Sequence, residues 1–152
     1  MIHYTSIIIP LLILLPNALF LLFPPIGRTE EAGKGKISYQ IAEGVGRIGV
    51  ILTPLFYPMY FDQPANIAGM IEMLLFLGIY LFCWIRYIIR KSDYTALFAP
   101  LLKLPVPMAW SPIMYFVCAS VMLHSLPLFC SALVLAAGHI PASLEEAKRL
   151  RV

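Results

Sequence analysis

Six polar or charged side chains lie in stretches of this sequence that are otherwise apolar, where such a group is costly to bury. They are Asn17, Glu43, Arg47, Glu72, His124 and His139. Ionisable residues inside membrane-buried segments mark ligand sites, ion sites or proton pathways by default, because an unpaired charge there costs free energy. We therefore take these six residues as candidates for binding a ligand or carrying a proton.

Glu43 and Arg47 are four residues apart with the acid first, which is the favourable order for an ion pair on a helix. Arg47 lies about 9 Å from the inner end of its expected segment at 1.5 Å per residue, and Asn17 lies at a similar depth in the preceding segment. His139 joins this group if the chain crosses the membrane five times. The two interpretations are a structural pair that reaches to the surface and a site for an anion or lipid headgroup.

Glu72 has no Lys or Arg close to it in the sequence. It is either a proton carrier or cation contact in a cavity, or a carboxyl near the lipid headgroups. The role of His124 depends on the number of spans. With five spans it caps an outer turn on the side of Glu72, and with four spans it lies in mid-membrane, where an imidazole suggests a proton relay.

A literal GxGxxG occurs at residues 44–49, but a dinucleotide site would need a preceding strand and a βαβ unit. Here a membrane helix is expected to follow a Gly-rich loop. Helix contact is the better interpretation, because small residues on one face let a neighbouring helix approach closely. The residues that share this face, spaced four, three and four apart, are Ala42, Gly46, Gly49 and Thr53.

The sequence contains no nucleophile elbow, zinc-protease helix or phosphate-binding loop. The three cysteines, Cys83, Cys118 and Cys130, lie in apolar stretches without metal-ligand spacing. We therefore predict no metal and no cofactor, and the residues leave open whether the chain is an enzyme.

The composition predicts how these residues are held in place. The chain is 61% hydrophobic and 12% charged, whereas a soluble domain carries about 25% charged residues. A fold of 152 residues cannot hide so many apolar side chains, because its surface is too large for its volume. We predict an all-α integral membrane protein that forms a single domain over residues 1–152, and the weak basic charge excludes a nucleic-acid partner.

Spanning helices need about 20 apolar residues, and three such segments are expected at residues 6–23, 41–60 and 66–86. Segment 92–104 is too short to span and is predicted to be interfacial or re-entrant. The last region is either one helix over 112–140 or a hairpin of 105–123 and 126–141, with Pro127 favouring the break.

Basic residues favour the cytoplasmic side of a membrane. They occur in the first loop, in segment 86–103 and in the tail 143–152, but not at the N-terminus or beside Asp62. This distribution favours five spans over four, with the N-terminus outside and the C-terminus in the cytoplasm of a cell membrane. The tail also contains Ser143 and Glu146 in the spacing of a capping box, which predicts that a helix begins there.

Three functions fit these features. The first is binding or helping to transport a small or amphipathic ligand across or within the bilayer, which implies a homo-oligomer or a partner membrane subunit. The second is a structural or assembly subunit of a larger membrane complex, which the small-residue face suggests. The third is a membrane-embedded enzyme acting on a lipid, which requires the inner polar residues to converge in one cavity.

Overall fold

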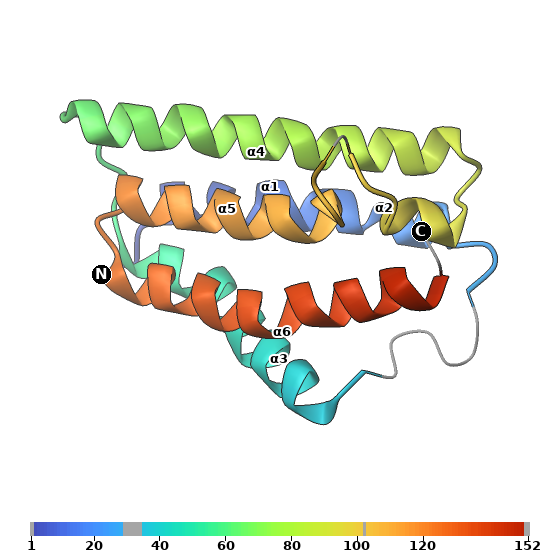
Figure 1. Cartoon of the computed structure of the whole chain (residues 1–152). Coiled ribbons are helices and arrows are strands. Elements are labelled where there is room, and N and C mark those ends of the chain that lie inside the picture. Colours follow the sequence, from blue (N-terminus) through green and yellow to red (C-terminus); the bar gives the residue numbers. More distant parts are fainter. Residues whose placement is uncertain (1, 29–34, 102, 151–152) are drawn as a thin grey trace.

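The computed structural model describes residues 2–28, 35–101 and 103–150, and its regular elements are all helical. Figure 1 shows long helices lying side by side, with one of them, α3, running obliquely across the others. In chain order the elements are η1 (Tyr4–Ile7), α1 (Ile8–Asn17), α2 (Leu19–Leu22), α3 (Ile37–Leu52), η2 (Thr53–Phe56), α4 (Pro64–Ile89), η3 (Tyr94–Leu97), α5 (Pro107–Met122) and α6 (Leu126–Leu150). The predicted all-α fold is confirmed at this level.

Helix α5 is the centre of the structure. It lies between α4 and α6 and packs against both, while α3 packs mainly against α6 (Figure 1). Most of its side chains are buried, including Tyr115 and Phe116, and the Tyr115 hydroxyl donates to the Ile9 carbonyl at 2.9 Å. The outer helices instead leave large apolar side chains exposed, such as Leu75 on α4 and Leu133 on α6.

The connections divide between two ends of the helices (Figure 1). At one end lie the N-terminus, residues 57–63 and the turn between α5 and α6, none of which contains Lys or Arg. The other end, which we call the basic end, holds the described parts of the α2–α3 and α4–α5 connections and the C-terminal part of α6. Its described basic residues outside α4 include Arg28, Lys36, Lys91, Lys103 and Arg149.

Three helical stretches are long and apolar enough to cross a membrane, judged by length and composition: Tyr4–Leu22, Pro64–Ile89 and Leu126–Leu150. The first includes η1, α1 and α2, and the junction between α1 and α2 is at Ala18, shortly after Pro16. Helix α5 is apolar but shorter, with 16 residues. Helix α3 also has 16 residues and begins at Ile37, four residues before the expected start of the second span, and it passes into η2.

The last region is a hairpin, so the alternative of one helix over 112–140 is wrong. Helix α5 ends at Met122, and His124 turns the chain with a left-handed φ of 49°. Ser125 then caps α6, since its Oγ accepts a hydrogen bond from the Leu128 amide at 3.2 Å. The backbone therefore breaks at His124, just before the proline that indicated a break.

One other expectation needs correction. Helix α6 continues through Pro141 to Leu150, so the helix start predicted at Ser143 is wrong, and the described part of the tail belongs to α6. Helix α6 packs against α3 and α5, and Pro141 does not interrupt it. Segment 92–104 contains η3, and its Ala96 and Leu97 are buried in the core. Its interfacial or re-entrant position in a membrane stays a prediction.

Asp93 caps η3 at the basic end. Its carboxylate accepts from the Thr95 hydroxyl at 2.7 Å and from the Thr95 amide at 3.0 Å. Those hydrogen bonds from Thr95 hold the pKa of Asp93 below its ordinary value, because they favour the charged form. Arg86 on α4 fixes the residues that follow, with its guanidinium donating to the carbonyls of Ala96, Ala99 and Pro100.

Candidate ligand-binding site

A cavity of about 460 Å³ lies between α1, α3, α4, α5, α6 and the loop after η3. Its volume falls in the range of small-molecule sites, roughly 300–1,000 Å³. The walls are mainly apolar and include Ile13, Leu14, Val50, Leu97, Met108 and Phe116. The polar side chains that also line it are Asn17, Arg47, Tyr80, His139 and Ser143.

One polar contact joins α1 to α4 across the cavity wall. The Tyr80 hydroxyl donates to Asn17 Oδ1 at 2.8 Å, and Asn17 Nδ2 donates to the Ile13 carbonyl in its own helix at 3.3 Å. Both the oxygen and the nitrogen of the Asn17 side-chain amide therefore have a hydrogen-bond partner. This contact places a buried tyrosine, which is 4% exposed, in the wall of the cavity.

A second polar cluster joins α3 to α6. Glu43 Oε1 accepts from Arg47 Nη2 one turn along α3, and it lies 3.1 Å from His139 Nδ1 on α6. Arg47 and His139 line the cavity, while Glu43 stands behind them. The carboxylate can orient the imidazole and share the charge of the guanidinium.

Glycines bring α3 and α6 close enough for this cluster to form. A Cβ added at Gly46 or Gly49 would lie less than 3.0 Å from Leu135 or Ser131 of α6, respectively. Gly138 of α6 meets the Glu43 backbone in the same way. The predicted small-residue face therefore lies against α6 of the same chain, with Ala42 half-buried beside it and Thr53 beginning η2.

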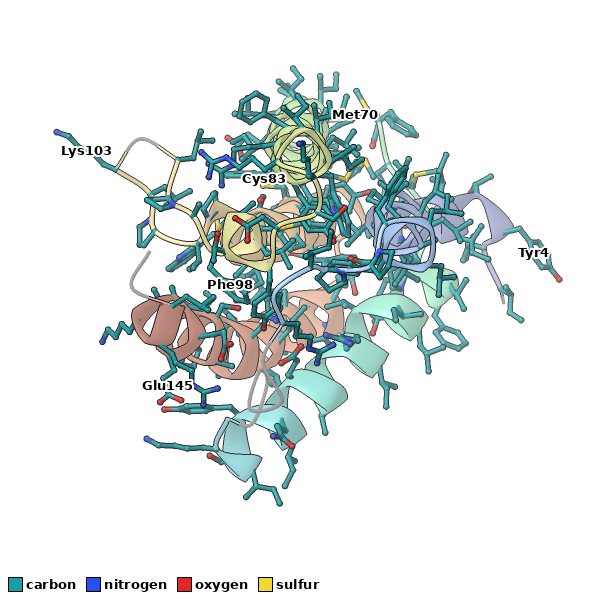
Figure 2. The ribbon with its side chains drawn as sticks, turned by 90° about the vertical axis from the view of Figure 1, so that its right-hand side faces the viewer. Tyr4, Met70, Cys83, Phe98, Lys103 and Glu145 are labelled. Atoms are coloured by element: carbon teal, nitrogen blue, oxygen red, sulfur yellow. The ribbon has the colours of Figure 1, made fainter. Side chains whose placement is uncertain are left out.

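A smaller hollow of about 270 Å³, which we call the vestibule, adjoins the cavity at the basic end. Phe98, His139 and Ser143 line both spaces, so they form a neck between them. The vestibule also contacts charged side chains, including Glu43, Glu145 and Glu146. In Figure 2, Phe98 lies between the yellow loop after α4 and the red helix α6, which carries Glu145 on its outer side.

The aromatic residues that line the cavity from α4 were not among the site residues predicted from the sequence. Tyr80 and Trp84 line the cavity from α4, and Phe20 meets Trp84 edge-to-face with ring centroids 4.6 Å apart. Tyr80, Trp84 and the buried Tyr87 are spaced four and three residues apart, which places them on one face of a helix. That spacing was the available signal for this wall of the site.

The structure divides the six candidates into two groups. Asn17, Arg47 and His139 line one cavity, and Glu43 contacts two of them. Glu72 is exposed on α4, 3.6 Å from the Cys118 thiol. It does not line the cavity.

His124 belongs to the end opposite the basic end, in the turn between α5 and α6. Its Nε2 lies 2.8 Å from Asn66 Oδ1, and its ring stacks on Tyr60 with centroids 4.8 Å apart. Asn66 is fully buried and also donates to Asp62 at 3.2 Å. These contacts join the turn to the start of α4, which is a structural role for His124.

Within the described residues, no group of three or more His, Cys, Asp or Glu side chains is placed to hold a metal ion. No protein-family model matches the chain, and no curated protein or solved structure matches it either. Function therefore has to be inferred from the geometry of the cavity.

Proposed function

We propose that this chain is a five-span membrane protein that binds an amphipathic ligand in the cavity and helps to hold or move it within the bilayer. The observation that carries the proposal is a mainly apolar cavity whose polar groups gather near one end. An apolar pocket with a few placed polar groups is the usual form of a small-molecule site. Asn17, Arg47 and His139 would contact the polar part of the ligand.

The membrane location rests on the exposed apolar side chains and on the distribution of charge. Large apolar residues cover the outer helices, and a water-soluble monomer rarely exposes so much apolar surface. Among the described residues, every Lys and Arg except Arg47 lies at or near the basic end. By the positive-inside rule this end faces the cytoplasm, so the cavity opens toward the inner leaflet.

Reporter fusions test this topology. Compartment-sensitive reporters placed at Gly35 and after Val152 should give the cytoplasmic signal, and one placed at Gln63 should give the opposite signal. The reason is that five crossings put both the first loop and the C-terminus on the basic side. Opposite signals from Gly35 and Val152 would rule out the five-span arrangement.

Narrowing the cavity tests ligand binding. Leu14 lines the cavity, whereas the next residue, Leu15, points away and is 72% exposed. Chain purified from membranes in a neutral maltoside detergent should carry a co-purifying amphiphile that mass spectrometry detects. We expect Leu14→Trp to lower its occupancy at least about tenfold, since the indole takes up cavity volume, and Leu15→Trp to leave it unchanged.

Equal occupancy in the two variants would place the amphiphile outside the cavity and contradict the proposal. The absence of any bound amphiphile in the unmodified chain would do the same. A homo-oligomer or partner subunit remains a prediction that the same preparation can test by its mass.

A lipid-acting enzyme is the second candidate, because the inner polar residues converge as that function requires. Glu43 contacts Nδ1 of His139, and within the described residues Nε2 makes no hydrogen bond, so Nε2 can exchange a proton with a substrate. The two candidates differ in one result: an enzyme would convert the bound amphiphile over time, whereas a binding protein would retain it. An assembly subunit has less support, because α6 of the same chain already covers the small-residue face.

A further inference from the structure

We propose that the ligand has a single apolar chain and an anionic head, either a carboxylate or a phosphate ester, and that Arg47 binds this head inside the cavity, beside its neck. This inference rests on the proposed function, since it names the class of ligand for the same cavity. It is carried by the hydrogen-bond donors around the neck, by the position of Arg47 and by the vestibule.

Inside the cavity, beside the neck, two side chains offer hydrogen-bond donors. A guanidinium has five N–H donors, and among the described residues Arg47 uses one of them, on Glu43. The Ser143 hydroxyl, on the same side of the cavity, makes no hydrogen bond to the part of the chain that the structure describes. Carboxylate and phosphate oxygens are strong acceptors, and they can bind the donors that the chain itself does not use.

Arg47 also shares its ion-pair partner with a second side chain. Glu43 is its ion-pair partner, but the same carboxylate oxygen contacts His139 at 3.1 Å. Arginine inside a membrane segment is expensive unless it is paired or reaches water. A planar guanidinium binds carboxylate or phosphate with two parallel hydrogen bonds, so an anionic head would complete the pairing that Glu43 begins.

The linings and volumes of the cavity and the vestibule indicate which end of the ligand lies in each. The cavity wall beyond the neck is formed by apolar residues such as Leu14, Phe20 and Phe116, which suit an alkyl or prenyl chain. The volume of about 460 Å³ lies in the lower half of the range of small-molecule sites, roughly 300–1,000 Å³, which favours one such chain over two. The vestibule has a volume of about 270 Å³, and its charged lining is Glu43, Glu145, Glu146 and Arg149. It therefore suits a polar or cationic group esterified to a phosphate better than the anion itself.

Trp84 provides a reporter inside the cavity. The chain has two tryptophans, and Trp84 is 1% exposed and lines the cavity, whereas Trp110 does not. In the Trp110→Phe variant, a bromine-bearing chain that enters the cavity quenches Trp84 by contact. The probes are a brominated fatty acid, the matching alkyl phosphate and the matching alcohol, each added to chain in neutral detergent. The Trp84→Phe variant, which keeps Trp110, controls for quenching from the detergent phase.

We expect both anionic probes to bind about 10- to 100-fold more tightly than the alcohol, the range of a hydrogen bond to a charged group. Arg47→Gln should abolish this difference, Arg47→Lys should keep part of it, and Arg90→Gln at the basic end should keep all of it. Tighter binding of the phosphate than of the carboxylate would identify a phospholipid-type head, and the reverse a fatty acid.

Equal binding of the alcohol and both anions to the unmodified site would overturn the anionic head, while the proposed function would stand. If no probe quenches Trp84, the proposed function itself fails. The comparison of the three probes needs no Arg47 variant, so it decides the inference even if Arg47→Gln does not fold.

Discussion

Replacing Gly46 with alanine should destabilise the protein by about 3 kcal/mol or more, the upper part of the range for overfilled cores. The added Cβ would lie less than 3.0 Å from the backbone of Leu135 in α6. Backbone cannot rotate away as the end of a long side chain can, so α3 and α6 would have to separate. The loss should appear as a lower midpoint in thermal unfolding followed by size-exclusion chromatography in detergent.

Gly44 provides a matched control in the same helix. A Cβ at Gly44 would meet nothing within 4 Å, and alanine favours a helix over glycine by about 1 kcal/mol. Gly44→Ala should therefore unfold at the same temperature as the unmodified chain or above it. If the two variants unfold alike, the close approach of α3 and α6 is not the arrangement of the folded protein.

The separation of α3 and α6 would also affect the candidate site. Glu43 and His139 stand on these two helices and meet at 3.1 Å. A variant that keeps the helices folded but moves them apart should lose this contact before the rest of the structure. Ligand binding is therefore expected to fall more steeply than stability across substitutions at Gly46, Gly49 and Gly138.

Some of this arrangement follows from the sequence alone. The spacing of Gly46 and Gly49 indicates a face for close helix contact, and the structure places α6 against it. The order and spacing of Glu43 and Arg47 predict their pairing. These features are predictable because helix geometry places residues three and four apart on the same side.

Other parts of the site are not readable from local patterns. A shared depth of Asn17 and Arg47 says nothing about which way two helices are rotated, so their common cavity is set by tertiary contacts. At Ser143 a local pattern is present but misleading. The spacing of Ser143 and Glu146 matches a capping box, yet Ser143 lies inside α6. Contacts between helices there outweigh the local signal, since Glu146 is buried and accepts from the Tyr94 hydroxyl at 3.3 Å.

The vestibule depends on a loop that has little regular structure of its own, and Arg86 is the residue that holds this loop. Its guanidinium donates to three carbonyls, at 2.5 Å from Ala99, 2.9 Å from Pro100 and 3.4 Å from Ala96. Hydrogen bonds to a charged group contribute about 1.5–3 kcal/mol each when their partners have no substitute. Since water can reach part of this loop, we expect Arg86→Met to cost about 3 kcal/mol in total.

The loop should open before the whole protein unfolds, because Phe98 lies in the sequence between two of the residues whose carbonyls Arg86 binds. Limited proteolysis should cut the Arg86→Met variant within residues 96–104 at least about tenfold faster than the unmodified chain. Arg90→Met is the matched control, because Arg90 is exposed one turn further along the chain and its guanidinium makes no hydrogen bond to these carbonyls.

Release of a bound amphiphile should also be faster in the Arg86→Met variant, since Phe98 forms one side of the neck. Faster cleavage with unchanged release would mean that the ligand leaves by another path, whereas unchanged cleavage would show that the loop is held by its own apolar contacts and not by Arg86.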